Sequence, residues 1–283
     1  MMEFGTGQAF RDASWFERVA ALFRAPLARS PLRGPLKRAY EAVLDRLPGD
    51  RLVCHFPEGE SVRLAAAFRQ VTWNAEEYRA FKADIAPGDT VLDVGANLGA
   101  YAVLFGQWVG AAGRVFAFEP APEARRGLER HVAINGLDGR VVVRPEAMAD
   151  QAGTVRFRAS GPHGDNRIMR ADREAVPDCI DVATTSIDTF CRERNLQPRF
   201  IKVDVEGAEL DVLRGARETI AAGGASLNLY VEMHPHLWPA LGTSRTEIEQ
   251  ELERQRLRPE RLDGRPDVWA IEGVCLRMKR CGS

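Results

Sequence analysis

Residues 90–101 read Thr-Val-Leu-Asp-Val-Gly-Ala-Asn-Leu-Gly-Ala-Tyr, and this stretch decides the fold class. Val91, Leu92 and Val94 form a short apolar run of strand type, which follows the turn signal Pro-Gly-Asp at 87–89. Residues 100–109 are apolar enough for a helix that packs on a sheet. The stretch predicts a strand, a glycine-rich turn and a helix. Open α/β sheets bind cofactors at the carboxyl end of such a first strand.

An acidic residue further along the chain supports a cofactor site. A second predicted strand, residues 114–118, ends in Glu119 and Pro120. An acid at the tip of the second strand is placed to accept hydrogen bonds from both hydroxyls of a ribose. Gly95 and Gly99, which carry no Cβ, let a ligand approach the backbone of the turn closely. Together these features predict a nucleoside-containing cofactor.

The order of acid and glycines distinguishes between cofactors. A dinucleotide fold reads G-x-G-x-x-G and directs a helix N-terminus at a pyrophosphate. Here Asp93 precedes Gly95, Asn97 and Gly99. A carboxylate repels a pyrophosphate but suits a cationic amino-acid group, which indicates S-adenosylmethionine. Two alternatives stay open: a strand-to-helix turn with chance glycines, and an Asn97 side chain that stabilises the turn instead of binding the cofactor carboxylate.

Composition limits the classes of protein to consider. With 283 residues and 45% hydrophobic content, the chain is long enough for a substantial core, and we expect one domain with an N-terminal extension. The net charge of −1 argues against a nucleic-acid-binding protein. The five cysteines lack C-x-x-C spacing and are expected to be reduced thiols. Without a secretory signal or an apolar run of about 20 residues, a cytoplasmic protein is expected.

The N-terminal part differs in character from the rest. Residues 1–48 predict a helical extension, in which Ser14 caps one basic amphipathic helix and residues 36–47 form another. Residues 14–24 could contact an anionic membrane surface. We favour packing against the catalytic domain or against a second subunit in a homo-oligomer, because apolar helix faces usually bury in protein.

Residues 49–86 are expected to form a lead-in of two short strands, 51–56 and 61–64, and a helix capped by Asn74. Trp73, Glu77 and Tyr78 could face a substrate or pack in the core.

From residue 87 to residue 283, strands and helices alternate. This pattern predicts an α/β, Rossmann-like fold with a mostly parallel sheet, helices on both faces and an antiparallel C-terminal edge. An outer strand is expected at 153–158 and a mobile loop or lid at 160–176. The other expected strands are 91–94, 115–118, 141–144, 181–185, 200–203, 227–231, 257–262 and 268–275, and the main helices are 100–109, 122–135, 186–195, 209–220 and 244–255.

Further polar residues follow three later strands. Glu146 and Ala147 follow the third strand, where a sheet of this type places the adenine. Asp204 and Glu206 follow the strand at 200–203, and Glu232 and His234 follow the next strand. Because ligands bind at the carboxyl ends of the strands, we expect at least one of Asp204, Glu206 and His234 to face the substrate.

The ordered set of these motifs resembles the FkbM family of S-adenosylmethionine-dependent methyltransferases. The resemblance covers roughly residues 85–275 and implies a class I methyltransferase fold, S-adenosylmethionine as cofactor, and methyl transfer to a hydroxyl oxygen of a sugar or natural product. Residues 1–84 show no such match. The matching fragments are Asp-Val-Gly-Ala-Asn-Leu-Gly at 93–99, Phe-Glu-Pro at 118–120, Asn-Gly-Leu at 135–137, Thr-Ser-Ile-Asp at 185–188, Ile-Lys-Val-Asp-Val-Glu-Gly-Ala-Glu at 201–209 and Glu-Met-His at 232–234.

Methyl transfer to an alcohol needs a general base or a metal ion, because the hydroxyl must lose a proton as it attacks. Asp204, Glu206, Glu232 and His234 compete for the role of base, and Asp204 also counts among the cofactor-side residues. Structural alternatives exist for three of them: Asp204 can cap the next helix, Glu206 (or Glu209) can serve its first turn, and His234 can be a turn residue. Asp204, Glu232 and His234 could also hold a divalent cation, although no compact motif requires one.

The leading hypothesis is an O-methyltransferase that acts on a small-molecule or glycan acceptor. An NAD(P)-dependent Rossmann oxidoreductase is the alternative enzyme, and the absent G-x-G-x-x-G counts against it. A scaffold protein that keeps the fold without activity is the third hypothesis. The acidic residues Asp93, Glu119 and Asp204 at three strand tips argue against such loss of function.

Overall fold

In the computed structural model, the described residues are 51–161, 166–169, 178–269 and 274–281. The helices expected within residues 1–48 lie outside these ranges. The described chain forms a central sheet with the strand order β12-β13-β11-β10-β3-β4-β5. Its strands are β3 (Thr90–Val94), β4 (Arg114–Phe118), β5 (Val141–Arg144), β10 (Phe200–Val203), β11 (Asn228–Met233), β12 (Leu257–Arg261) and β13 (Val274–Arg280).

The pairing of these strands is that of class I methyltransferases. β11, β10, β3, β4 and β5 are parallel neighbours, and β13 inserts antiparallel between β11 and β12. The strand order reverses between β3 and β10, so their carboxyl ends flank the crevice where open α/β sheets bind ligands. The fold class expected from the sequence is confirmed.

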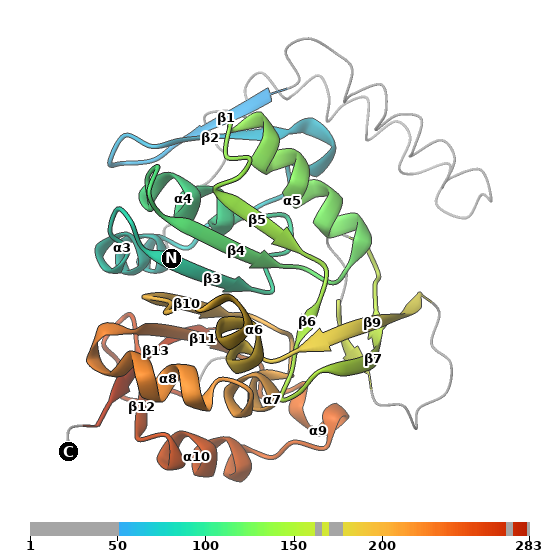
Figure 1. The fold of residues 1–283 in the computed structure, drawn as a ribbon, viewed down its shortest axis with the longest axis vertical. Coiled ribbons are helices and arrows are strands. Elements are labelled where there is room, and N and C mark those ends of the chain that lie inside the picture. The colour runs from blue at the N-terminus through green and yellow to red at the C-terminus, as the bar shows by residue number, and fades with distance from the viewer. Residues whose placement is uncertain (1–50, 162–165, 170–177, 270–273, 282–283) are drawn as a thin grey trace.

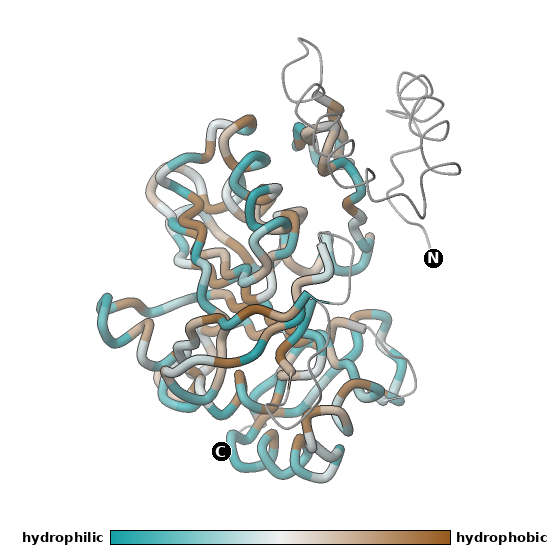
Figure 2. Tube along the Cα trace, turned by 90° about the vertical axis from the view of Figure 1, so that its right-hand side faces the viewer, coloured by the Kyte–Doolittle hydropathy of each residue, from teal (hydrophilic) through white to brown (hydrophobic). Residues whose placement is uncertain are grey.

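Helices cover both faces of the sheet (Figure 1). Side chains alternate along a strand, so Val91 and Phe200 pack in one core while Leu92 and Ile201 pack in the other. Figure 2 shows the hydrophobic stretches running through the interior of the molecule. The first core contains residues of α3 (Ala75–Asp84), α4 (Ala100–Trp108) and α5 (Pro122–Ile134); the second contains residues of α6 (Ile187–Arg194), α7 (Glu209–Arg214), α8 (Arg217–Gly223), α9 (Trp238–Leu241) and α10 (Arg245–Arg254).

The lead-in segment packs against the first core. Strands β1 (Arg51–His55) and β2 (Ser61–Ala65) form a hairpin beside α5 (Figure 1). Asn135, at the end of α5, exchanges hydrogen bonds of 2.8 and 2.9 Å with the backbone of Arg63. Asn74 caps α3 through its side chain, as expected, because its oxygen accepts from the backbone N–H groups of Glu76 and Glu77.

A second, four-stranded sheet lies at the carboxyl ends of β4 and β5 (Figure 1). It has a small core of its own, in which Phe157 and Val182 pack with Ala147. The segment 153–158, expected as an outer strand, belongs to this second sheet, and the expected loop at 160–176 contains a strand. The four strands are β6 (Ala147–Met148), β7 (Gly153–Arg158), β8 (Arg167–Met169) and β9 (Cys179–Thr185).

Three boundaries differ from those expected. The helix expected at 209–220 breaks at Gly215, where a Cβ would lie 2.2 Å from the carbonyl oxygen of Ala149 and where the Gly215 carbonyl accepts from Asp188 N–H. β11 extends to Met233, so Glu232 is a strand residue. The last strand begins at Val274, not at residue 268. Its residues Cys275, Leu276 and Met278 are buried against β11.

The five cysteines are free thiols, as expected. Within the described ranges, none of the helices combines the length and apolar character needed to cross a bilayer.

Replacing Phe81 by Ala should lower the free energy of unfolding by about 3–5 kcal/mol. Its fully buried ring packs against the rings of Tyr101, Phe105, Phe200 and Tyr230 and so joins α3 to the sheet. Urea denaturation measures the loss. The control is Arg79→Ala, at an exposed position of the same helix, with a change below about 0.5 kcal/mol. A Phe81→Ala loss no larger than that of the control would contradict this account.

Candidate active site

The glycine-rich turn after β3 is held between the tips of β4 and β10. The backbone N–H groups of Gly95 and Ala96 both donate to the carbonyl of Phe118, at 3.0 and 2.9 Å. Gly95 has a φ of 82°, and a Cβ on it would lie 1.7 Å from the backbone oxygen of Asp204. A side chain at this position would push the two strand tips apart, so the turn requires glycine.

The acid at the tip of β4 is built into the same turn. Glu119 is buried, and its two carboxylate oxygens accept from the N–H groups of Asn97 and Ala121, each at 2.8 Å. Burial raises the pKa of Glu119 to about 7, although these two hydrogen bonds act in the opposite direction. A carboxylate oxygen can accept more than one hydrogen bond. Glu119 is therefore a fixed acceptor that can still bind a pair of hydroxyls.

Glu119 belongs to a first cleft of about 630 Å³, a volume that includes space open to solvent. Glu146, which is paired with Arg144, and Ala147 border this cleft beyond the tip of β5. The second sheet contributes the opposite wall. The lining residues are Val94, Gly95, Asn97, Phe118, Glu119, Pro120, Glu146, Ala147, Met148, Phe157, Asn166, Ile168, Asp204, Val205 and Glu206.

A second cleft adjoins the first and shares Gly95, Asn97 and Asp204 with it. Asp93 faces this second cleft and is 1% exposed, and neither of its carboxylate oxygens has a hydrogen-bond partner within the described ranges. Burial raises its pKa to about 6, while the charge of Lys202 opposes the rise. A buried carboxylate without a hydrogen bond suits a cationic group such as the ammonium of S-adenosylmethionine.

The far wall of the second cleft comes from the lead-in segment. Trp73 and Glu77 line it together with Tyr101 of α4. Tyr101 Oη donates to Glu77 Oε2 at 2.6 Å, and Trp73 Nε1 donates to the carbonyl of Ala100 at 2.9 Å. Tyr78, grouped with them in the sequence analysis, instead donates to Glu60 at 2.7 Å in the core. This wall therefore offers aromatic surface and one acid to whatever occupies the cleft.

An ion pair anchors the tip of β10. Lys202 Nζ, on a buried side chain, lies 3.0 Å from Asp204 Oδ2. Burial alone would raise the pKa of Asp204, but Lys202 and His234 together lower it. The Asp204 carboxylate is therefore ionised at neutral pH and lies at the boundary of the two clefts.

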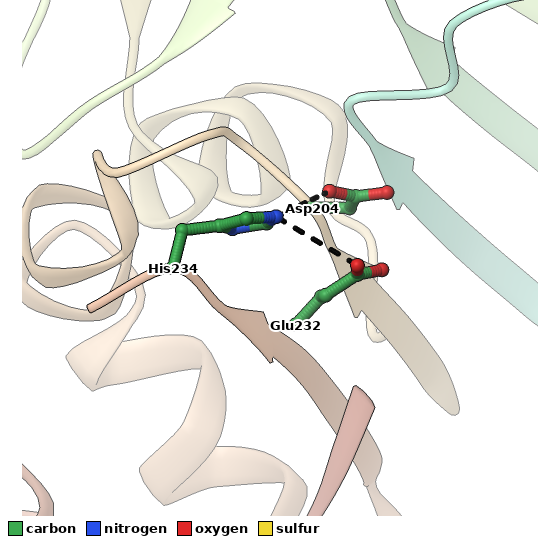
Figure 3. A group of neighbouring side chains, drawn as sticks. All are labelled: Asp204, Glu232 and His234. Atoms are coloured by element: carbon green, nitrogen blue, oxygen red, sulfur yellow. Dashed lines mark ion pairs between the residues drawn. The ribbon is translucent and has the colours of Figure 1, made fainter. Parts of the chain in front are cut away.

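His234 brings the acids of the two strand tips together. Its Nδ1 is 2.8 Å from Glu209 Oε1, and its Nε2 lies 3.9, 3.8 and 3.7 Å from carboxylate oxygens of Asp204, Glu206 and Glu232. Figure 3 shows the ring directed at Asp204 and Glu232 from the turn after β11. All four of the catalytic candidates from the sequence therefore meet at one place.

The surroundings raise the pKa values of two members of this cluster, Glu232 and His234, and lower the pKa of Asp204. Burial, followed by the charge of Asp204, raises the pKa of Glu232 to about 8. Burial alone would lower the pKa of His234, but the hydrogen bond and charge of Glu209 and the charges of Asp204 and Glu206 raise it to about 9. An imidazole with such a pKa is protonated at neutral pH and is a poor base in that form.

Comparison with known proteins gives the family. Residues 93–259 match the methyltransferase FkbM domain family. The chain belongs to this family. The match includes the glycine-rich turn, Glu119 and the cluster around His234, and it excludes the lead-in segment that supplies Trp73 and Glu77.

Three curated proteins are similar to this FkbM domain chain. The 2-O-methyltransferase NoeI of Sinorhizobium fredii is 30% identical over 47% of this chain and 60% of its own length. The 31-O-demethyl-FK506 methyltransferase FkbM of Streptomyces tacrolimicus is 27% identical over 61% and 75%, respectively. The hexuronic acid methyltransferase AglP of Haloferax volcanii is 29% identical over 53% and 58%. The chain thus spans about 60% of the length of two of these relatives.

Most of the predicted cofactor-side residues lie around one cleft of the FkbM domain. Asp93 lies on the adjoining cleft, and Gly99 lines neither cleft. Gly99 has a φ of 81° and begins α4, where a Cβ would lie 2.4 Å from Leu128 Cδ1. Its position is explained by helix packing. Lys202 has no site role among the sequence predictions, although a lysine inside the apolar run of β10 indicates a buried charge.

Glu209 is the second residue without a predicted site role. The sequence analysis considered it only as an acid in the first turn of a helix, whereas the structure places it behind His234. No local sequence pattern predicts the contact between Glu209 and His234, because the two residues are 25 positions apart in the chain.

The stability of the cation-free protein should fall as the pH rises from 5 to 9. The raised pKa values mean that the folded state binds more protons than the unfolded state in this range, so deprotonation favours unfolding. The contribution of His234 is fully present below about pH 6.5 and is lost as the pH rises through about 9; raised carboxyl pKa values act in the same direction.

Glu232→Gln should flatten this decline between pH 5 and 8 by up to about 1.4 kcal/mol per pH unit. Urea denaturation in EDTA at each pH measures it. Glu253→Gln, at an exposed helix position, is the matched control and should keep the wild-type slope. A wild-type stability that rises over this range would refute the prediction.

Proposed function

We propose that this FkbM domain protein transfers a methyl group from S-adenosylmethionine to a hydroxyl oxygen of a sugar, glycoside or natural-product acceptor. The observation that carries the proposal is the position of Asp204. This one carboxylate lines both the cleft of Glu119 and the cleft of Glu77 and Glu232. A group at the boundary of a cofactor cleft and an acceptor cleft is placed where the two reactants must meet.

The cofactor would occupy the first cleft and its boundary with the second. Glu119 would accept from the ribose hydroxyls, and Glu146 and Ala147 would lie at the adenine edge. Asp93 would pair with the ammonium group, which would supply the partner that this buried carboxylate lacks. Gly95 lines both clefts, and its missing side chain lets the turn lie against the backbone of Asp204 at their boundary. Bound there, S-adenosylmethionine supplies an electrophilic methyl group.

The acceptor would occupy the second cleft, between the acidic cluster and the lead-in wall. Asp204, ionised through its pair with Lys202, would accept a hydrogen bond from the acceptor hydroxyl and hold its oxygen in line for attack. Glu206, whose side chain is 44% exposed, would pass the released proton to solvent. His234 would fix the positions of these carboxylates, since Glu209 holds its ring in one orientation.

The names of the relatives support this acceptor class. Two of the names give an oxygen position: NoeI is called a 2-O-methyltransferase, and FkbM is called a 31-O-demethyl-FK506 methyltransferase. The third name, that of AglP, gives hexuronic acid. The aromatic and acidic wall formed by Trp73, Tyr101 and Glu77 has the composition suited to a polyhydroxylated ligand.

Calorimetric titration with S-adenosylhomocysteine, the demethylated cofactor, should give one binding site, and NAD should give no heat of binding. Asp93→Asn should weaken binding at least tenfold, because it removes the charge opposite the ammonium. Asp138→Asn, at an exposed position, is the matched control and should bind as the wild type does. Binding of NAD would favour an oxidoreductase, and binding of neither would favour a scaffold protein.

Asp204→Asn should lower kcat by about 10²–10⁴-fold, because the amide cannot accept the proton of the acceptor. The assay measures transfer of a labelled methyl group to a panel of free sugars, uronic acids and hydroxylated macrolides. Glu253→Gln is again the control. A variant with unchanged turnover on an acceptor that the wild type methylates would rule out this role for Asp204.

A further inference from the structure

We propose that Asp204, Glu232 and His234 bind a divalent first-row transition-metal ion, for which Mn²⁺ is a suitable probe. Each residue offers one ligand atom, and these three atoms lie within 4.8 Å of one another. They come from the tips of two adjacent parallel strands, β10 and β11, and converge from different directions on the gap seen in Figure 3.

The distances from His234 to the two carboxylates are too long for hydrogen bonds and suit a shared ion, while Asp204 and Glu232 are close enough to share a hydrogen bond. His234 Nε2 is 3.9 Å from Asp204 Oδ1 and 3.7 Å from Glu232 Oε1. Metal–ligand bonds of about 2.0–2.3 Å place two ligands of one ion about 3 Å apart when adjacent and about 4.4 Å apart when opposite. Side-chain rotations of a small size would therefore bring all three atoms onto one ion.

His234 presents an unused ligand atom to this gap. Its side chain is only 6% exposed, and its Nδ1 is engaged with Glu209. Its Nε2 has no hydrogen-bond partner within the described part of the chain, and it is directed at the two carboxylates. A metal ion in the gap would bind this nitrogen in place of a proton and would give it a partner that the described residues do not provide.

The support behind His234 is that of a metal ligand. The fully buried Glu209 holds Nδ1 at 2.8 Å and is itself held by the N–H of Gly207 at 2.9 Å and by Trp238 Nε1 at 2.7 Å. A carboxylate on the far nitrogen fixes the ring orientation of metal-binding histidines and makes them more basic ligands. Glu209 thus holds the ring, and Gly207 and Trp238 fix Glu209 in turn.

The charge around the gap also calls for a cation. Within the described ranges, the carboxylates of Asp93, Asp204, Glu206, Glu209 and Glu232 surround the single buried ammonium of Lys202 and the imidazole of His234. A divalent ion would offset two of these negative charges. The mixed oxygen and nitrogen ligand set favours Mn²⁺ over Mg²⁺, which prefers oxygen ligands alone.

The effect of the ion on an acceptor hydroxyl rests on the proposed function, whereas binding of the ion to the protein does not. Asp204 and Glu232 both line the second cleft, so the open coordination positions would face the acceptor. An acceptor hydroxyl bound there would have a lowered pKa and would lose its proton more readily as it attacks.

The test is a titration of the full chain, treated with EDTA and dialysed, with Mn²⁺ alone. Electron paramagnetic resonance of free Mn²⁺, checked by calorimetry, should show one bound equivalent with a dissociation constant in the micromolar range. Asp204→Asn and His234→Gln should each weaken binding at least tenfold, and Glu209→Gln should weaken it about 10–100-fold through its hold on the ring. Glu253→Gln should bind Mn²⁺ as the wild type does.

Circular dichroism on the same samples establishes that each variant is folded, and titration with S-adenosylhomocysteine measures cofactor binding separately. No Mn²⁺ binding at millimolar concentration in folded wild-type protein would overturn the inference, as would binding that Asp204→Asn and His234→Gln leave unchanged. If S-adenosylhomocysteine binds and Mn²⁺ does not, the metal site is refuted while the proposed function stands. If Mn²⁺ binds and S-adenosylhomocysteine does not, the proposed function fails and the metal site stands.

Discussion

The parallel pairing of β3 with β10 is the constraint on which both clefts depend. Their register places Asp93 beside Lys202, and the N–H of Asp204 continues the pairing to the carbonyl of Val94 at 2.9 Å. Beyond that bond the two chains diverge, and Gly95 lies against the backbone oxygen of Asp204. The glycine-rich turn and the acidic cluster are therefore two sides of one contact, and neither can shift without the other.

Buried charge is concentrated where these strands end. Elsewhere the sheet is apolar on both faces, as expected for parallel strands covered by helices. At the carboxyl edge, Lys202 offsets the carboxylates of Asp93 and Asp204, and Glu209 holds His234. Such a concentration of burial and like charge costs folding free energy and is found at functional sites more often than in purely structural positions.

The sequence predicted the parts of the fold that local patterns determine. The strands of the sheet were visible as short apolar runs, and α3 was visible from its capping residue Asn74. Tertiary contacts decided the rest. The helix breaks at Gly215, where the backbone contacts Ala149 and Asp188, and no local pattern shows these contacts. Phe157 packs in the separate core of the second sheet, which a local pattern does not show either.

The same division applies to the site. Residues next to strand tips were predictable because parallel strands end at one edge of the sheet. For this reason the sequence alone groups Asp204 with His234, whose side chains lie 3.9 Å apart. Partners that depend on side-chain direction were not predictable. Glu209 accepts from the Gly207 N–H beside the helix start and also holds His234, and only the surroundings of Asp93 leave its carboxylate without a hydrogen bond among the described residues.

The origin of the second cleft's far wall has a consequence for how the site is encoded. Trp73 and Glu77 precede residue 93, where the family match begins, while the opposite wall lies within it. Under the proposed function, the groups proposed for catalysis and part of the surface proposed for the acceptor are therefore encoded in separate stretches of chain that share one core through Phe81. A change confined to the lead-in would then alter that wall and leave Asp204, Glu232 and His234 in place, and a chimaera joined near residue 86 would follow the same division.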